Sequence, residues 1–354
     1  MKTTEFHPEE INRCIEFVKN HLEESDDIDI RYYSPAGVPS LVALPQGITK
    51  PNILLNAHLD VVSLAEEVPY RSFVKDGKII GPGVGDMKGE LAILLEVFRN
   101  IHAEIPDASL GIAITSDEER GGEHGIKYLF EKEGVRCNLA IIPDSGSLNE
   151  ITIEEKGVIH MVISAEGEAG HASRPWMVEN PLERISDSIY QIRSCFKQME
   201  SDNDNWHPTF ATTIIHTDNE AINRIPEKAE AHCDIRFPSP HTVDSVLSII
   251  KSHLDEDMSL KLIVSSNPSH LSPDPLFVQI TEEITGKPTT FFRAHGGSDA
   301  RFISSLDIPV IMSRPIVGDT HSVHEWIDID SMETLYHIYM KYLRKKLFKG
   351  DATL

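Results

Sequence analysis

The sequence predicts an α/β protein in which a mostly parallel sheet is covered by helices and a smaller α+β domain is inserted. Three observations support this prediction. Short apolar runs alternate with helix-like segments in the first part of the chain. Near Ile151 the predicted order of elements changes to a strand–helix–strand–strand–helix–strand block. The alternation of apolar runs with helix-like segments then returns. A length of 354 residues is sufficient for two such domains.

The first region begins with a helix predicted over residues 7–22, where apolar residues recur at helical spacing. Apolar runs bounded by turn residues then predict strands at 41–44, 52–57, 110–115 and 139–142. An apolar-rich helix is expected at 90–102. Continuous apolar strands that alternate with helices are typical of a parallel sheet buried on both faces.

The inserted region is expected to be a ferredoxin-like, lid-like domain. Its predicted strands are 158–165, 209–216, 229–237 and 260–265, and its predicted helices are 181–199 and 242–254. A return linker at 266–275 then leads to a helix at 276–285, a strand at 310–313 and a helix at 332–348. The chain is thus divided into a first domain (1–154 and 268–354) and an inserted lid-like domain (155–267).

Composition restricts the partners and the location. The net charge of −23 disfavours nucleic acid and anionic membranes as partners. The four cysteines are scattered and form no C-x-x-C pair, so free thiols are expected. The first residues lack a secretory pattern, and no run approaches the ~20 apolar residues of a membrane span. We therefore expect a cytoplasmic protein.

A histidine and an aspartate follow the predicted strand that ends near Ala57. His58 and Asp60 are two positions apart, so in extended chain both side chains face the same side. Open α/β sheets bind ligands at the carboxyl ends of their strands, and a carboxylate can hold a metal-binding imidazole in one tautomer. Taken alone, the pair is equally consistent with a surface H-x-D segment that has no role.

A glycine-rich turn at 81–89 places Asp86 just before a predicted helix. A carboxylate on a tight loop can bridge two cations, with one oxygen to each. Two alternatives remain for this turn. Asp86 could simply cap the helix, or the turn could bind phosphate, although the G-x-x-x-x-G-K-[ST] spacing is missing.

Three adjacent carboxylates, those of Asp117, Glu118 and Glu119, follow the predicted strand 110–115. They repel one another unless they are solvated or bound to a cation. Adjacent residues point in different directions, which suits one metal ligand and one general base. A solvated acidic loop is the alternative, but the position at a strand end and the glycines that follow weigh against it.

Asp144 follows the last apolar strand of the first region, and His321 and His324 follow the strand at 310–313. Successive strand ends therefore deliver carboxylates and imidazoles but no thiolate. This mixture of ligands is typical of zinc, cobalt or manganese sites.

The ordered set of motifs resembles the M20 family of metallopeptidases and deacylases over nearly the whole chain. His58-Leu59-Asp60 resembles the family's H-x-D, Asp86-Met87-Lys88-Gly89 its D-x-K-G, and Glu118-Glu119 its glutamate pair. His321, four residues before Glu325, matches the late histidine, whereas the competing His324 has the wrong spacing.

The resemblance implies a dinuclear metal centre, with zinc as the expected metal and cobalt or manganese as alternatives. His58, Asp86 and Asp144 would hold one ion, and Asp86, Glu119 and His321 would hold the other. Glu118 would be the general base and Asp60 would support His58. Aspartate at position 144 is more typical of aminopeptidases and dipeptidases of the family, whereas its desuccinylases and carboxypeptidases usually have glutamate there.

The lid motifs of the family also have counterparts. His171 lies in a G-H-x-x-x-P segment and would stabilise the oxyanion, in the family often from a dimer partner. Asn223 and Arg236 match N-x-I-P and D-x-R elements, and Ser298 and Arg301 belong to a segment like G-G-T-S-D-G-R. Arg236 is the first candidate for gripping a substrate carboxylate, because a guanidinium can bind one bidentately. A structural lid histidine and surface arginines are the alternatives.

The implied function is removal of an acyl group from an N-acyl amino acid, or cleavage of a small peptide with a free carboxylate. A dipeptidase or aminopeptidase of the same family is one alternative. A catalytically silent, metal-containing binding protein is another, although the presence of Glu118 argues against it. The resemblance further implies a homodimer formed through the lid.

Overall fold

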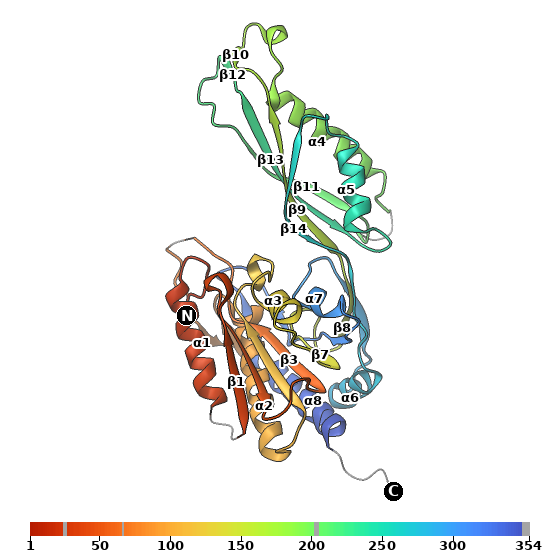
Figure 1. Ribbon diagram of the computed structural model, residues 1–354. Helices are drawn as coiled ribbons and strands as arrows, with labels where there is room; N and C mark the ends of the chain where they lie inside the picture. The colour runs from red at the N-terminus through yellow and green to blue at the C-terminus, as the bar shows by residue number, and fades with distance from the viewer. Residues whose placement is uncertain (24–26, 66, 202–204, 349–354) are drawn as a thin grey trace. The chain divides into compact units, whose positions relative to one another are not determined.

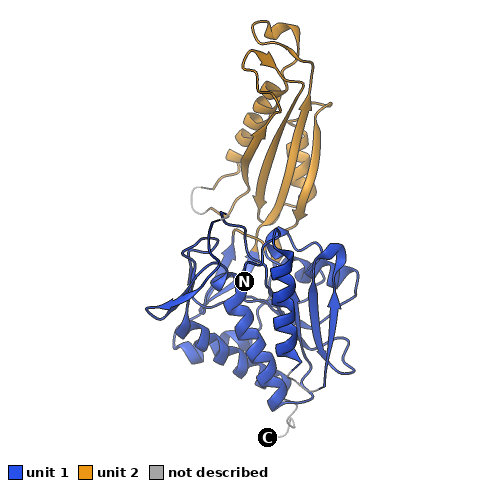
Figure 2. Ribbon diagram, turned by 90° about the vertical axis from the view of Figure 1, so that its left-hand side faces the viewer, with its two compact units in different colours: residues 1–154, 270–294, 298–354 blue, residues 155–269, 295–297 orange. Residues whose placement is uncertain are grey.

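The computed structural model describes residues 1–23, 27–65, 67–201 and 205–348. The chain divides into two compact units, which Figure 2 shows in different colours. Unit 1 consists of Met1–Glu154, His270–Ala294 and Ser298–Leu354. Unit 2 consists of Glu155–Ser269 and His295–Gly297.

Unit 1 is built on a six-stranded sheet with the order β1-β2-β6-β3-β7-β17. The strands are β1 (Ile28–Tyr33), β2 (Ser40–Pro45), β3 (Ile53–His58), β6 (Leu110–Thr115), β7 (Leu139–Ile141) and β17 (Val310–Ile311). The pairs β6–β3, β3–β7 and β7–β17 are parallel, so the prediction of a mostly parallel sheet is confirmed.

Two strands at one edge of this sheet run the other way. β1 pairs antiparallel with β2, and β2 pairs antiparallel with β6. The strand predicted at 41–44 therefore lies in the antiparallel edge of the sheet. A parallel crossover needs a dozen or more residues, and only residues 46–52 separate β2 from β3.

Helices cover both faces of the sheet, as expected from its apolar strands (Figure 1). The helices of unit 1 are α1 (Pro8–Leu22), α2 (Gly89–Glu104), α3 (Ile126–Glu131), α6 (Pro275–Thr285), α7 (Ala300–Ser304) and α8 (Ile329–Leu347). Alternate residues of β3 enter two different cores, because successive side chains of a strand point to opposite faces. Ile53 and Leu55 pack with α1, α2, α6 and α8, whereas Leu54 packs with α3 and α7.

Two small sheets of unit 1 lie outside the sequence prediction. One has the order β18-β19-β5-β4 and the other has the order β15-β8-β16. Their strands are β4 (Phe73–Lys75), β5 (Lys78–Ile80), β8 (Glu150–Glu155), β15 (Ser269–His270), β16 (Thr290–Ala294), β18 (Val317–Gly318) and β19 (Trp326–Asp328). The pairing of β19 with β5 brings the segment after His321 beside the glycine-rich turn of Asp86.

Unit 2 is a four-stranded antiparallel sheet with two helices on one face. Its strands are β9 (Gly157–Glu166), β11 (Thr209–His216), β13 (Lys228–Phe237) and β14 (Ser259–Ser266), in the order β11-β13-β9-β14. The helices are α4 (Pro181–Lys197) and α5 (Val243–Lys251), which pack on the alternate apolar residues of β9 and β13. A two-stranded ribbon joins β10 (Gly170–His171) to β12 (Arg224–Ile225).

The four cysteines Cys14, Cys137, Cys195 and Cys233 are free thiols, as expected. Among the described residues, no helix combines the length and the apolar character that crossing a membrane requires.

Candidate metal centre

The chemistry-bearing side chains of unit 1 gather at one edge of its central sheet. His58 ends β3 and pairs with Thr115, the last residue of the parallel strand β6. The turn that carries Glu118 and Glu119 follows β6, and Asp144 follows the neighbouring parallel strand β7. Because parallel strands end at the same edge, these residues from separate chain segments come together.

Asp86 reaches the same edge from the irregular turn η2 (Val84–Lys88), which leads directly into α2. The peptide bond between Asp86 and Met87 is cis. Glu325, which is buried, accepts a hydrogen bond from the backbone N–H of Gly85 at 2.7 Å. The Glu325 side chain thereby fixes the residue that precedes Asp86. The sequence motif indicated only the spacing of Glu325 from His321 and did not predict this role.

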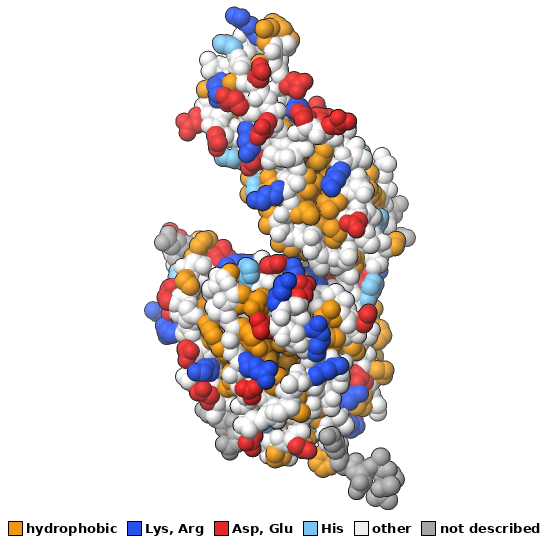
Figure 3. All heavy atoms as spheres, viewed as in Figure 1, with side chains coloured by type: hydrophobic (Ala, Val, Ile, Leu, Met, Phe, Trp, Pro, Cys, Tyr) orange, Lys and Arg blue, Asp and Glu red, His pale blue; other side chains and the backbone are white. Residues whose placement is uncertain are grey.

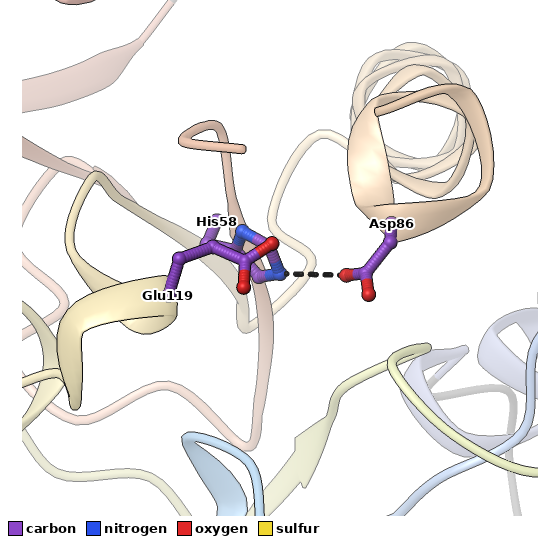
Figure 4. A group of neighbouring side chains, drawn as sticks. All are labelled: His58, Asp86 and Glu119. Atoms are coloured by element: carbon purple, nitrogen blue, oxygen red, sulfur yellow. Dashed lines mark ion pairs between the residues drawn. The ribbon is translucent and has the colours of Figure 1, made fainter. Parts of the chain in front are cut away.

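The carboxylate of Asp86 lies between two imidazoles. Its Oδ1 is 3.2 Å from His58 Nε2, and its Oδ2 is 3.0 Å from His321 Nε2. His321 Nε2 is also 3.5 Å from Glu119 Oε2. Figure 4 shows His58, Asp86 and Glu119 pointing toward one another. One carboxylate thus faces a histidine with each oxygen, which is the arrangement that a ligand shared by two cations requires.

His321 holds an unusual backbone conformation, with φ at +62°. A residue other than glycine in this left-handed region is under strain, and such residues cluster at functional sites. His324, the competing histidine of the sequence prediction, is exposed, and its backbone N–H donates to Ser322 Oγ. The contacts with Asp86 and Glu119 come from His321.

Two groups of side chains have their ligand atoms within 4.8 Å of one another: His58 with Asp86 and Glu119, and His58 with Glu118 and Asp144. Both groups contain His58. The second group contains both Glu118, expected to be a base, and Asp144, expected to be a ligand. The geometry therefore brings together all five predicted ligands and Glu118.

Buried atoms without hydrogen-bond partners show that this donor set fits a cation. Among the described residues, His58 Nε2 and Glu119 Oε1 are buried and accept or donate no hydrogen bond. Burial raises the pKa of Glu119 to about 8, and burial together with Asp144 raises that of Glu118 well above its usual range. Clustered carboxylates of this kind are costly unless a cation neutralises them. Oxygen and imidazole donors suit zinc, cobalt and manganese.

The histidines are held in charged form by their neighbours when no cation is bound. The hydrogen bond with Asp86 raises the pKa of His321 to about 9. Burial alone would lower the pKa of His58, but the contacts with Asp60 and Asp86 outweigh it and raise that pKa well above the usual value. Both imidazoles must lose a proton to bind a metal.

Asp60 joins the His58 strand to the acidic turn. Its backbone oxygen accepts a hydrogen bond from His58 Nδ1 at 3.1 Å, and its Oδ1 lies 3.5 Å from the same nitrogen. Its carboxylate also accepts the backbone N–H groups of Glu118 at 3.3 Å and Glu119 at 3.1 Å. Asp60 thus orients His58 and both glutamates, which is more than support of His58 alone.

Ser298 and Arg301, both expected to bind substrate, are buried and bound within unit 1. Arg301 donates to the backbone oxygens of Ser298 at 2.9 Å and Gly121 at 2.8 Å, and its Nη1 lies 4.0 Å from Glu118 Oε1. The hydroxyl of Ser298 accepts the N–H of Ala300. The contacts of Arg301 hold the acidic turn beside Glu118.

Asp299, which lies between Ser298 and Arg301, is buried and was not among the predicted site residues. Its Oδ2 accepts a hydrogen bond from Thr115 Oγ1 at 3.2 Å. Burial raises the pKa of Asp299 to about 7, although Arg301 opposes the shift. Its place between a strand end and the acidic turn could not be derived from spacing along the chain.

The remaining predicted site residues belong to unit 2. His171 lies on β10, is exposed, and accepts the N–H of Ser173 at its Nδ1. Asn223 is exposed, and its backbone oxygen accepts the N–H of Ala172. Arg236 uses its Nε and Nη2 to bind both oxygens of Asp234, at 2.7 Å and 3.0 Å. One bidentate edge of that guanidinium is therefore already engaged.

The sequence model of peptidase family M20/M25/M40 matches residues 54–345, which is most of the chain. The chain belongs to this family. It is thus a metal-dependent hydrolase of amide or peptide bonds, as the motifs predicted.

Family relatives match most of the chain. A succinyl-diaminopimelate desuccinylase of Rickettsia bellii (strain OSU 85-389) is 27% identical, and the match covers 95% of this chain and 92% of the relative. A desuccinylase of Pseudomonas syringae pv. syringae is 28% identical over 79% of this chain and 78% of its own length.

Solved structures share the fold. An M20 family metallo-carboxypeptidase from Sulfolobus solfataricus superposes with a TM-score of 0.75 at 15% identity, covering 94% of this chain and 92% of that one. A tripeptidase from Staphylococcus aureus gives 0.73 at 19% identity, with coverages of 93% and 92%. At these identities the likeness establishes the fold of the family alone.

Proposed function

We propose that this protein is a dinuclear metal-dependent amide hydrolase that removes an acyl group from an N-acyl amino acid or cleaves a small peptide with a free carboxylate. The observation that carries the proposal is the Asp86 carboxylate, which faces His58 and His321 with one oxygen each. Glu118 lies within the same cluster as His58 and Asp144. Binding alone would not require this additional, largely buried carboxylate.

The proposed ligands divide into two sets that share Asp86. His58, Asp86 and Asp144 would hold one ion, and Asp86, Glu119 and His321 would hold the other. Zinc is the proposed metal, with cobalt or manganese as alternatives, because the donors are oxygen and imidazole. An ion held by these residues would supply polarisation of the scissile carbonyl and would lower the pKa of a water molecule toward neutrality.

Glu118 would act as the general base and then as the general acid. Burial and Asp144 raise the pKa of Glu118 above the usual range of a glutamate, which favours its acceptance of a proton. The Glu118 carboxylate takes a proton from the attacking water and returns it to the departing nitrogen as the C–N bond breaks. Asp60, through its hydrogen bonds to the backbone of Glu118 and Glu119, holds the base in place. The products are a carboxylic acid and an amine.

Substrate recognition is assigned to unit 2 and to the segment that contains Ser298. We take residues 1–154 and 268–354 as the catalytic domain and 155–267 as a ferredoxin-like lid. His171 would stabilise the oxyanion, and Arg236 and Asn223 would bind the substrate. Ser298 and Arg301 stay in the proposed substrate-binding set, although their contacts also support a role in holding the acidic turn. The homodimer through the lid and the cytoplasmic location stay predictions.

The names of the relatives support two substrate classes. The desuccinylases among them favour an N-acyl amino acid, and the tripeptidase and carboxypeptidase neighbours favour a short peptide. Aspartate at position 144 is the feature that favours the peptidase alternative.

A panel of substrates tests the proposal and separates its alternatives. Metal-loaded protein would be offered amino acids with acetyl, succinyl and glutamyl caps, and dipeptides, each with a free and with a blocked carboxylate. Amine release would be measured. We expect turnover of at least one class with a free carboxylate and much slower turnover when that carboxylate is blocked. Inert protein across the whole panel, with zinc and with cobalt, would favour the silent binding protein instead.

A further inference from the structure

The first four residues of the chain, Met1–Thr4, form a segment that we call the N-terminal strap. Its two threonines, Thr3 and Thr4, are fully buried although they are polar and lie at the start of the chain. Buried hydroxyl groups in proteins are hydrogen-bonded, so the partners of these two side chains show what the strap binds.

Thr3 makes three hydrogen bonds to two different loops. Its hydroxyl donates to the backbone oxygen of Leu59 at 2.6 Å and accepts from Lys88 Nζ at 2.7 Å. Its backbone oxygen accepts the N–H of Val61 at 3.1 Å. One hydroxyl group therefore bridges the segment after β3 and the end of the turn η2.

Both partners are neighbours of metal-ligand candidates. Leu59 lies between His58 and Asp60, and Lys88 is two residues after Asp86. The same two loops place His58 Nε2 and Asp86 Oδ1 3.2 Å apart. The hydroxyl of Thr3 thus links the two chain segments whose side chains meet in the metal centre.

Lys88 makes this bridge sensitive to the loss of one hydroxyl. Its ammonium group also donates to the backbone oxygen of Met1, at 3.4 Å, so two residues of the strap accept hydrogen bonds from it. The Lys88 side chain is half-buried, so water reaches only part of it. An ammonium group in such a position that loses a hydrogen-bond acceptor is expected to move toward water, and η2 would move with it.

A third contact extends the strap to the loop that follows Val61. Lys2 Nζ lies 5.5 Å from the centre of the Tyr70 ring, a distance that permits a cation–π attraction. Tyr70 in turn donates to the backbone oxygen of Val62 and accepts the N–H of Leu64.

We propose that Thr3 is a positioning residue of the metal centre, whose hydroxyl fixes the spacing between the His58 loop and the Asp86 loop. The inference rests on the proposed function, because it needs a cation to be held by both loops. Thr3 contacts neither metal nor substrate. It acts through Leu59 and Lys88, and its loss should therefore weaken metal binding without abolishing the chemistry of the loaded enzyme.

Thr4 provides a matched control for the experiment. It is as buried as Thr3, but its hydroxyl bonds to His7 Nδ1 at 2.8 Å, at the start of α1. Thr3→Val and Thr4→Val therefore remove the same group from adjacent buried positions, and only the first breaks the bridge. Thr3→Ser keeps the hydroxyl and should behave as wild type.

The test is competitive titration of the metal-free full chain with Zn²⁺ against a chromophoric chelator, together with thermal unfolding of the metal-free forms. We expect Thr3→Val to bind Zn²⁺ about tenfold or more weakly, the size of effect seen for outer-shell groups of metal sites. Thr4→Val and Thr3→Ser should stay within about twofold of wild type on that scale. At saturating Zn²⁺, kcat of Thr3→Val should approach the wild-type value.

Lys88→Met is the second variant, and it breaks the same bridge from the other side if Thr3→Val does not fold. Equal Zn²⁺ affinity in a folded bridge variant and in Thr4→Val would overturn the inference while leaving the proposed function intact. Wild-type protein that binds no Zn²⁺, Co²⁺ or Mn²⁺ would instead overturn the proposed function, and this inference with it.

Discussion

The carboxylate of Asp86 connects two histidines that are distant in sequence, His58 and His321. Both histidines are proposed metal ligands, whereas the proposed proton carrier is the largely buried Glu118 beside them. At the scale of single residues, the groups that hold the metal are therefore distinct from the group that moves the proton. Each assignment leads to a different loss when the residue is changed.

Glu118→Gln should keep the bound metal and lose turnover, because the amide fills the same space but cannot accept a proton. The expected fall in kcat is on the order of 10²- to 10⁴-fold, the usual contribution of general acid–base catalysis. Elemental analysis and kcat would be measured on the same sample. Glu123→Gln, at an exposed position of the same loop, is the control and should retain full activity. A kcat for Glu118→Gln within a few-fold of wild type would refute its role as the base.

His321→Ala should reduce the bound metal, and His324→Ala should not. Of these two histidines, only His321 has an imidazole nitrogen within 3.5 Å of both Asp86 and Glu119. Elemental analysis of the two variants, purified in parallel, compares them directly. The assignment of His321 fails if both variants retain the wild-type metal content, or if His324→Ala alone loses metal.

The stability of the metal-free protein should fall as the pH rises from about 6.5 to about 9. The pKa of His321 is raised to about 9, chiefly by its hydrogen bond with Asp86, against about 6.5 in an unfolded chain. Its stabilising contribution is therefore fully present below about pH 6.5 and is lost as the pH rises through 9. Burial raises the pKa of Glu119 to about 8, which acts in the same direction.

Zinc affinity should rise over the same pH window, because these groups must lose their protons before they can bind the ion. Thermal unfolding with and without Zn²⁺ at several pH values measures both effects. We expect the difference in Tm between the loaded and the metal-free form to widen with pH. A difference that is constant or narrows would contradict the proposed ligand set.

At the scale of elements, helix α2 begins with a buried acid that faces the core. Glu90 is fully buried, and among the described residues its two carboxylate oxygens have no hydrogen-bond partner. Burial raises its pKa well above the usual range, although Arg314 opposes the shift. The folded protein therefore favours the protonated form of Glu90 to a higher pH than the unfolded chain does.

Glu90→Gln should make the metal-free protein less sensitive to pH. With Glu90 protonated only in the folded state, the unfolding free energy loses about 1.4 kcal/mol for each pH unit above the ordinary glutamate pKa. Glutamine has the same shape and no proton to lose. Denaturant unfolding of both proteins at about pH 5 and pH 7 gives the two slopes. Equal slopes would show that Glu90 is ionised in the folded state.

The longer elements could be predicted from the sequence because their apolar patterns are strong. The first helix was expected at 7–22 and spans Pro8–Leu22, and the strand at 209–216 is β11 as observed. Short strands such as β18 and β19 carry no periodic signal, because two or three residues cannot establish a period. Their positions depend on pairing with distant β5.

The sequence predicted that the proposed ligands lie together. It did not predict the contacts that support them. His58, Asp86, Glu119, Asp144 and His321 stand at strand ends or in motifs, and the structure brings them together. The contacts of Asp60, Glu325 and Asp299 with neighbouring backbone or hydroxyl groups depend on tertiary packing. The engagement of Arg236 by Asp234 also depends on it.

At the scale of the whole molecule, the net charge of −23 is compatible with an acidic metal centre and with a small anionic substrate. On the face shown in Figure 3, lysine and arginine side chains are interspersed among the acidic ones. A substrate carboxylate would therefore be recognised by local basic groups rather than by the overall field.

The measurement that tests the central claim most directly is amine release as Zn²⁺ is added stepwise to metal-free protein. The substrate would be the best compound of the panel, and bound metal would be counted at each step. We predict no turnover without metal, activity that rises as ions bind, and saturation near two ions per chain. Full activity in thoroughly metal-free protein, or a fully loaded protein with no more than one ion per chain, would contradict the dinuclear account.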